Sequence, residues 1–150
     1  MKRQISVRWL ALLILGVGVG LGAGDGIAQS IGNLFQMMGG MDTVGKLSSS
    51  LLQSSAADPR LAGVLGKADT GAMAPKLADQ MCSMLGGGCK APLNDQQISA
   101  GAGKLDKSQT QALSDNFSSA LKSVTGNSLV RDGVSKAIAP KLGGIVGALI

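Results

Sequence analysis

Hydrophobic residues recur at steps of three and four along most of this chain, which is the spacing of one face of an α-helix. The most regular run consists of Leu113, Phe117, Leu121 and Val124. No segment alternates between apolar and polar residues as a half-buried strand does, so the pattern predicts an all-α fold. The predicted helices cover residues 30–38, 42–57, 70–85, 107–125 and 128–149, with a short turn near Leu61 and a brief helical piece after Asn94.

Residues that start or stop helices stand at the ends of these stripes. Gly39 and Gly40 end the first helix, and three glycines at 86–88 end the third. Asp58 ends the second helix because the residue before Pro59 is pushed out of helical geometry. Thr70, Asp106 and Ser128 are placed where the last three long helices begin, with Thr70 and Asp106 as N-caps.

Two prolines fall inside predicted helices. Pro75 requires either that its helix starts later than Thr70 or that the first turn is irregular. Pro140 is expected to kink the last helix, because it removes a hydrogen bond one turn back. Gly101 and Gly103 weaken the prediction of a helical piece after Asn94.

The first residues have the pattern of an export signal. Lys2, Arg3 and Arg8 precede an uncharged stretch over residues 9–24, and the small residues Gly26 and Ala28 follow it. We predict cleavage after Ala28, which leaves a single domain over residues 29–150 in the periplasm or outside the cell. The alternative is a membrane anchor, but a span needs about 20 strongly apolar residues, and five glycines dilute this stretch.

The charge of the chain argues against nucleic acid as a partner. The chain has 14 basic and 9 acidic residues, and removal of residues 1–28 leaves a formal charge of +3. The basic residues are scattered and form no run that could follow a phosphate backbone.

The composition excludes most catalytic and metal chemistry, because the chain has no histidine, glutamate or tyrosine. We therefore predict no catalytic residue, no metal site and no enzymatic activity. Lys76 and Asp79, one helical turn apart, are expected to form a surface ion pair. The serines have no histidine to activate them, and a Ser-Lys arrangement has no supporting motif.

Cys82 and Cys89 are the only cysteines, and in an exported chain an even number favours a disulfide. A redox role is the alternative, but the spacing is not that of a C-x-x-C motif. We predict a structural bridge.

Four segments resemble the group 1 truncated globins, small helical proteins that in general hold haem between two helical pairs. They resemble the family's L-Y-x-x-L-G-G, A-D-P-R-L and Q-L-C-x-x-x-G-G-P-C-K motifs and the proline of its last helix. In chain order they are LFQMMGG (34–40), AADPRL (56–61), QMCSMLGGGCK (80–90) and APKL (139–142). The resemblance implies a truncated-globin-like helical sandwich.

The residues that hold and use haem in that family are missing at the matching positions. Its proximal histidine falls on Ala100, its distal tyrosine on Leu52 and its distal glutamine on Met73. The two phenylalanines that pack on haem fall on Val64 and Leu65. The resemblance therefore implies the fold without the coordination chemistry.

From these departures we expect an exported, haem-free protein with a binding or structural role. Its pocket is expected to be filled by Leu52, Met73, Met81, Met84 and Leu113, with any remaining cavity open to a small apolar ligand. Another exported protein is the second kind of partner expected.

The alternative function keeps haem and uses a methionine or lysine on the distal side for oxygen, nitric oxide or redox chemistry. Met73, Lys76, Met81 and Met84 are the candidate haem-binding residues in that case.

Overall fold

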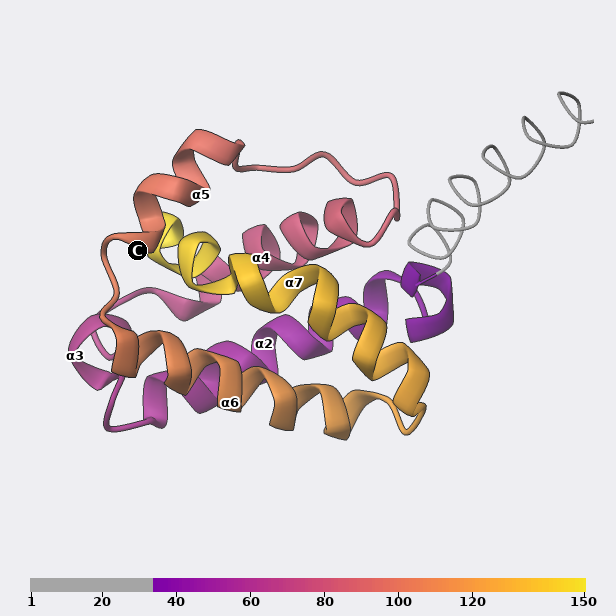
Figure 1. Cartoon of the computed structure of the whole chain (residues 1–150), viewed down its shortest axis with the longest axis horizontal. Coiled ribbons are helices and arrows are strands. Elements are labelled where there is room, and N and C mark those ends of the chain that lie inside the picture. Colours follow the sequence, from indigo (N-terminus) through magenta and orange to yellow (C-terminus); the bar gives the residue numbers. More distant parts are fainter. Residues whose placement is uncertain (1–33) are drawn as a thin grey trace, which may run out of the picture. The chain divides into compact units, whose positions relative to one another are not determined.

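The computed structural model describes residues 34–150, so the predicted signal over 1–28 lies outside the described residues. Helices form the whole regular structure of the described part, which contains no strand, and the predicted all-α fold is confirmed. A helical turn at 34–38 comes first. The helices that follow, labelled as in Figure 1, are α2 (Met41–Ala57), α3 (Ala62–Leu65), α4 (Thr70–Met84), α5 (Asp95–Ala102), α6 (Lys107–Val124) and α7 (Ser128–Leu149).

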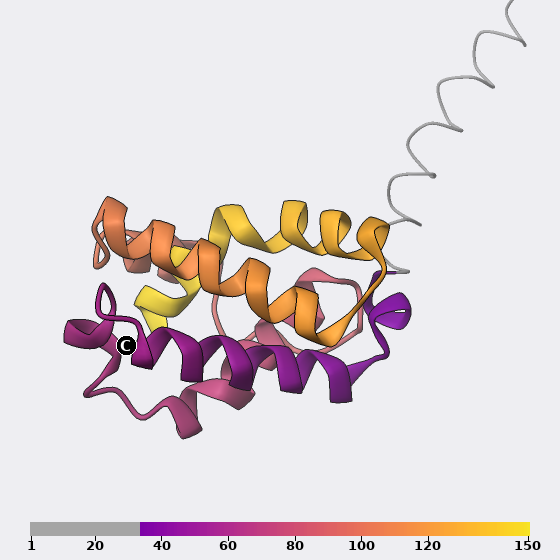
Figure 2. The same ribbon diagram turned by 90° about the horizontal axis from the view of Figure 1, so that it is seen from below.

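The four long helices form two antiparallel pairs. Helix α2 packs against α4, and α6 packs against α7. The pairs are joined by contacts of α2 with α6 and of α4 with α7. Figures 1 and 2 show α2 and α6 lying side by side and running in opposite directions. Helix α5 belongs to neither pair. It packs against α7 near the C-terminus (Figure 1).

The apolar stripes predicted from the sequence face one another in the core. The buried residues of α6 include Leu113, Phe117 and Leu121 of its predicted stripe, and Val124, the last member of that stripe, is partly buried against the core. Phe117 is the largest fully buried side chain. It is joined by fully buried leucine, methionine and isoleucine side chains from the other three long helices, among them Leu47, Leu51, Leu77, Met81 and Ile138.

Most helix ends lie where the sequence places them. Helix α2 follows Gly39 and Gly40, whose φ angles of 107° and 76° suit glycine. Asp106 caps α6, and it forms a capping box with Gln109. Helix α5 begins with a capping box between Asn94 and Gln97, so the uncertain helical piece after Asn94 is confirmed.

Helices α4 and α7 begin at Thr70 and Ser128 as predicted, but the N-cap of α4 differs from the prediction by one residue. Asp69, and not Thr70, caps α4, because its carboxylate accepts the backbone N–H of Ala72 at 3.0 Å. Asn127 caps α7, for which the sequence analysis names no cap. Asp69 and Thr70 are both residues of capping type, so the local sequence does not distinguish them.

The two prolines leave their helices continuous. Helix α4 begins at Thr70 and includes Pro75, so the helix does not start late. Pro75 is the sixth residue of α4 and has no N–H to donate to the carbonyl of Gly71, yet the helix continues through it to Met84. Helix α7 likewise runs through Pro140 to Leu149.

Candidate functional site

The predicted disulfide between Cys82 and Cys89 is present, with the two Cα atoms 5.6 Å apart. It joins the end of α4 to the loop that follows. Gly86 and Gly88 turn this loop with positive φ angles of 81° and 77°. A methyl group at Gly87 would lie 2.5 Å from Cys82 Sγ and 2.8 Å from the ring of Phe35. Gly87 therefore packs closely against both the bridge and the aromatic ring of Phe35.

The candidate haem-binding residues of α4 do not share one environment. Met73 and Met81 are buried, Met84 is half-buried, and Lys76 is exposed. The Met81 sulfur accepts a hydrogen bond from the buried Ser48 hydroxyl at 3.6 Å. The inner face of α4 is therefore apolar, and its one candidate cationic ligand faces solvent.

Positions that carry haem-contacting aromatic side chains in the resembling family belong to the apolar core here. Leu52 is fully buried, and Leu65 is 1% exposed. Val64 packs against the core while remaining partly exposed. Core side chains therefore occupy the space at these positions.

The position that matches the proximal histidine of the resembling family faces outward. Ala100 is exposed on α5, whereas Ile98 and Gly101 are the buried residues of that helix. The residues present do not form the haem site of the resembling family, because neither Ala100 on α5 nor Lys76 on α4 faces the helical core.

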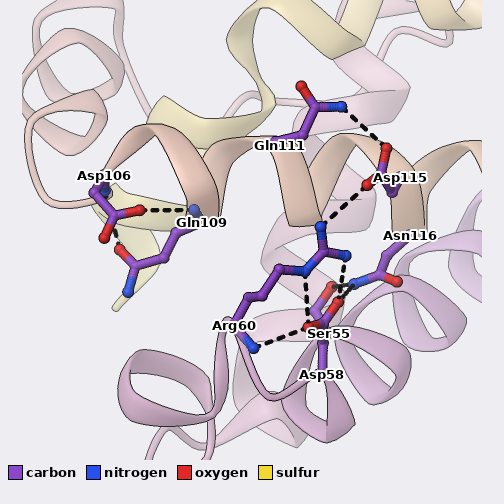
Figure 3. A network of polar contacts seen from close by, with 8 residues as sticks. All are labelled: Ser55, Asp58, Arg60, Asp106, Gln109, Gln111, Asp115 and Asn116. Atoms are coloured by element: carbon purple, nitrogen blue, oxygen red, sulfur yellow. Dashed lines mark hydrogen bonds and ion pairs between the residues drawn. The ribbon is translucent and has the colours of Figure 1, made fainter.

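A polar network at the end of α2 was not predicted as a site (Figure 3). Arg60 lies 2.9 Å from the Asp58 carboxylate and 3.2 Å from that of Asp115 on α6. The side-chain amide of Asn116 donates to Asp58 at 3.1 Å and to Ser55 at 3.4 Å. The A-D-P-R-L segment was the available signal, but it was interpreted only as a helix stop and a family motif.

The pKa of Asp58 is lowered to about 2 from 3.8, first by the side-chain hydrogen bonds from Arg60 and next by its backbone N–H. The Asp58 and Asp115 carboxylates in turn raise the pKa of Arg60. Each charged group has its partners within the network, so the arrangement connects α2 to α6 and offers no free group for chemistry.

The predicted ion pair between Lys76 and Asp79 does not form. The ion pairs of the described residues join Arg60 to Asp58 and Asp115, and Lys141 to Asp95. An exposed pair one turn apart gains only a few tenths of a kcal/mol, which does not hold a flexible lysine side chain in place.

Two open grooves lie between paired helices. One, of about 500 Å³, runs between α2 and α4 and is lined by Met41, Gly45, Ser49 and Ala74 among others. The other, of about 430 Å³, lies between α6 and α7 beside Lys107, Thr110 and Leu142. Both are surface features, separate from the buried methionines.

Within residues 34–150, no group of three or more cysteine and aspartate side chains is placed to hold a metal ion. No helix in this part of the chain is long and apolar enough to cross a bilayer. In comparisons with known proteins, no family model, no curated protein and no solved structure matches the chain.

Proposed function

We propose that this chain is an exported, globin-like helical protein that does not use haem and whose role is binding or structural support. The observation that carries the proposal is the filled interior. Met73 is 4% exposed, and Leu52 and Met81 are fully buried, at positions where a truncated globin would face its haem. The burial of these side chains supports the haem-free part of the proposal, because a large planar ligand needs open space at the positions that they occupy.

Two further observations support parts of this proposal. The pairing of α2 with α4 and of α6 with α7 is in keeping with the two helical pairs of the truncated globins. The Cys82–Cys89 bridge is in keeping with an oxidising compartment. Together with the signal-like pattern over residues 1–28, the bridge favours the periplasm or the exterior of the cell.

A haemin titration of the exported, purified chain tests the haem-free part of the proposal. We expect the absorption spectrum of free haemin at every ratio. A Soret band at stoichiometric intensity would overturn the proposal, and its loss in Met73→Leu would assign the alternative methionine ligand. Met37→Leu is the matched control, because Met37 is 54% exposed.

Crosslinking in the native cell envelope, followed by mass spectrometry, tests the binding role. We expect one dominant protein partner, with crosslinks from lysines such as Lys46 and Lys76, which are exposed. Recovery of no partner at native abundance would contradict a protein-binding role. The α2–α4 groove is the surface to examine first, because it is the larger of the two grooves described above.

A further inference from the structure

Helix α5 presents only a narrow face to the rest of the protein. Ile98 and Gly101, three residues apart, are its buried residues. Ser99, Ala100 and Ala102 are exposed. The rotation of α5 about its own axis therefore decides which residues face α7.

Three glycines bring the backbones of α5 and α7 together. A methyl group at Gly101 would collide with the carbonyl oxygen of Gly144 and the amide nitrogen of Ala148. A methyl group at Gly144 would collide with the carbonyl oxygen of Ile98, and one at Gly147 with that of Gly101. We call Gly101, Gly144 and Gly147 the glycine contact.

The atoms that meet in the glycine contact belong to the backbone on both sides. A flexible side chain can move away from an added methyl group, but the carbonyl of a neighbouring helix moves only with its helix. Each of the three positions therefore requires a residue without a side chain.

This requirement limits how α5 can turn. Successive residues of an α-helix point about 100° apart, so turning position 100 inward means moving Ala100 into the place of Gly101. The Ala100 methyl group would then meet the carbonyl of Gly144, where the structure leaves no room for a methyl group.

We infer that the glycine contact fixes α5 in a rotation that keeps position 100 in solvent, so that a histidine there cannot serve as a haem ligand inside the protein. The inference rests on the proposed function, because it gives the structural reason for the missing coordination chemistry. It adds that a single substitution at position 100 does not create a haem ligand inside the protein.

Two histidine variants test the orientation of position 100. Ala100→His carries the side chain at the family's ligand position, and Ala102→His is the matched control, because both alanines are exposed on α5. We expect the two variants to give the same spectrum with haemin, differing from the parent chain only as surface histidines do. A stoichiometric Soret band in Ala100→His that is absent from Ala102→His would overturn the inference.

Two alanine variants test the contact itself. Gly101→Ala is expected to lower the thermal midpoint by about 5 °C or more, because overpacking forces the helices apart. Gly103→Ala is the control, since a methyl group there would lie 3.6 Å from the nearest atom, which is ordinary contact. Its midpoint should stay unchanged or rise slightly. Equal midpoints for the two variants would contradict the inference.

The outcomes separate this inference from the proposed function. Haem binding by the parent chain would contradict the proposed function. If the parent chain binds haem, the two histidine variants still test the inference. A change of the haem spectrum in Ala100→His that is absent from Ala102→His would overturn it.

Discussion

Asp58 accepts a hydrogen bond from the backbone N–H of Arg60 at 2.9 Å and another from the Arg60 guanidinium, also at 2.9 Å. The two residues flank Pro59, which ends α2, and Arg60 reaches on to Asp115 of α6. A turn that stops one helix therefore also connects it to the helix beside it. This relationship favours the ionised carboxylate and gives the fold a dependence on pH.

We expect the network to weaken in acid. The pKa of Asp58 is lower in the folded protein, about 2, than its ordinary value of 3.8. Its contribution to stability is therefore complete above pH 3.8 and is lost as the pH falls toward about 2. Urea midpoints across this window should fall less steeply for Asp58→Asn than for the parent chain.

Asp132→Asn is the control for the acid experiment, because Asp132 is exposed on α7 and takes part in none of the ion pairs described. It should keep the parent slope. An Asp58→Asn variant with the parent slope between pH 3.8 and about 2 would show that the Asp58–Arg60 hydrogen bonds do not stabilise the fold.

The disulfide is expected to stabilise the fold measurably. Closing a loop between residues seven apart lowers the entropy of the unfolded chain, which corresponds to about 2 to 3 kcal/mol. Dithiothreitol should therefore lower the urea midpoint of the parent chain and leave that of Cys82→Ala/Cys89→Ala unchanged. Alkylation without reduction should label neither cysteine, and labelling of both would contradict the bridge.

The helices and their buried faces could be predicted because both depend on local sequence. The spacing of Leu113, Phe117 and Leu121 specifies an apolar face, and Asp106 with Gln109 specifies a helix start. Such signals need no knowledge of the rest of the fold. The predicted N-cap of α4 was wrong by one residue, because Asp69 stands next to Thr70 and is equally suitable as a cap.

The contacts that connect distant segments were not predictable in this way. Gly101 counted against a helix by its own propensity, yet the structure uses it where α5 meets Gly144 of α7. Nothing in the sequence around Asp115 on α6 indicates that its carboxylate pairs with Arg60, which follows α2. Both interactions depend on how the helices pack, which the periodicity of one helix does not determine.

The cap of α6 offers a test of local stability. The backbone N–H of Gln109 donates to the Asp106 carboxylate at 2.8 Å, and the backbone N–H of Asp106 donates to the Gln109 side-chain oxygen at 3.0 Å. Asp106→Ala should lower the free energy of unfolding by about 1 kcal/mol. Asp132→Ala, which removes an exposed aspartate without a cap, should change it by less than about 0.5 kcal/mol. Equal losses would contradict the capping role.

Methionine oxidation distinguishes a filled interior from an open pocket. Met37 and Met41 are 54% and 39% exposed, whereas Met73 is 4% exposed and Met81 is fully buried. Peroxide should therefore convert Met37 and Met41 to sulfoxides well before Met73 and Met81, because oxidation of the thioether requires access to its sulfur. Peptide mass spectrometry over a time course measures the order.

The oxidation order also tests the proposed absence of a haem pocket. An open pocket would admit peroxide, which would then oxidise Met73 at a rate close to that of Met41. If core side chains fill it, Met73 reacts only when the helices open, and its oxidation should slow further under conditions that stabilise the fold. Rapid oxidation of Met73 in the folded protein would therefore contradict the filled interior on which the proposed function depends.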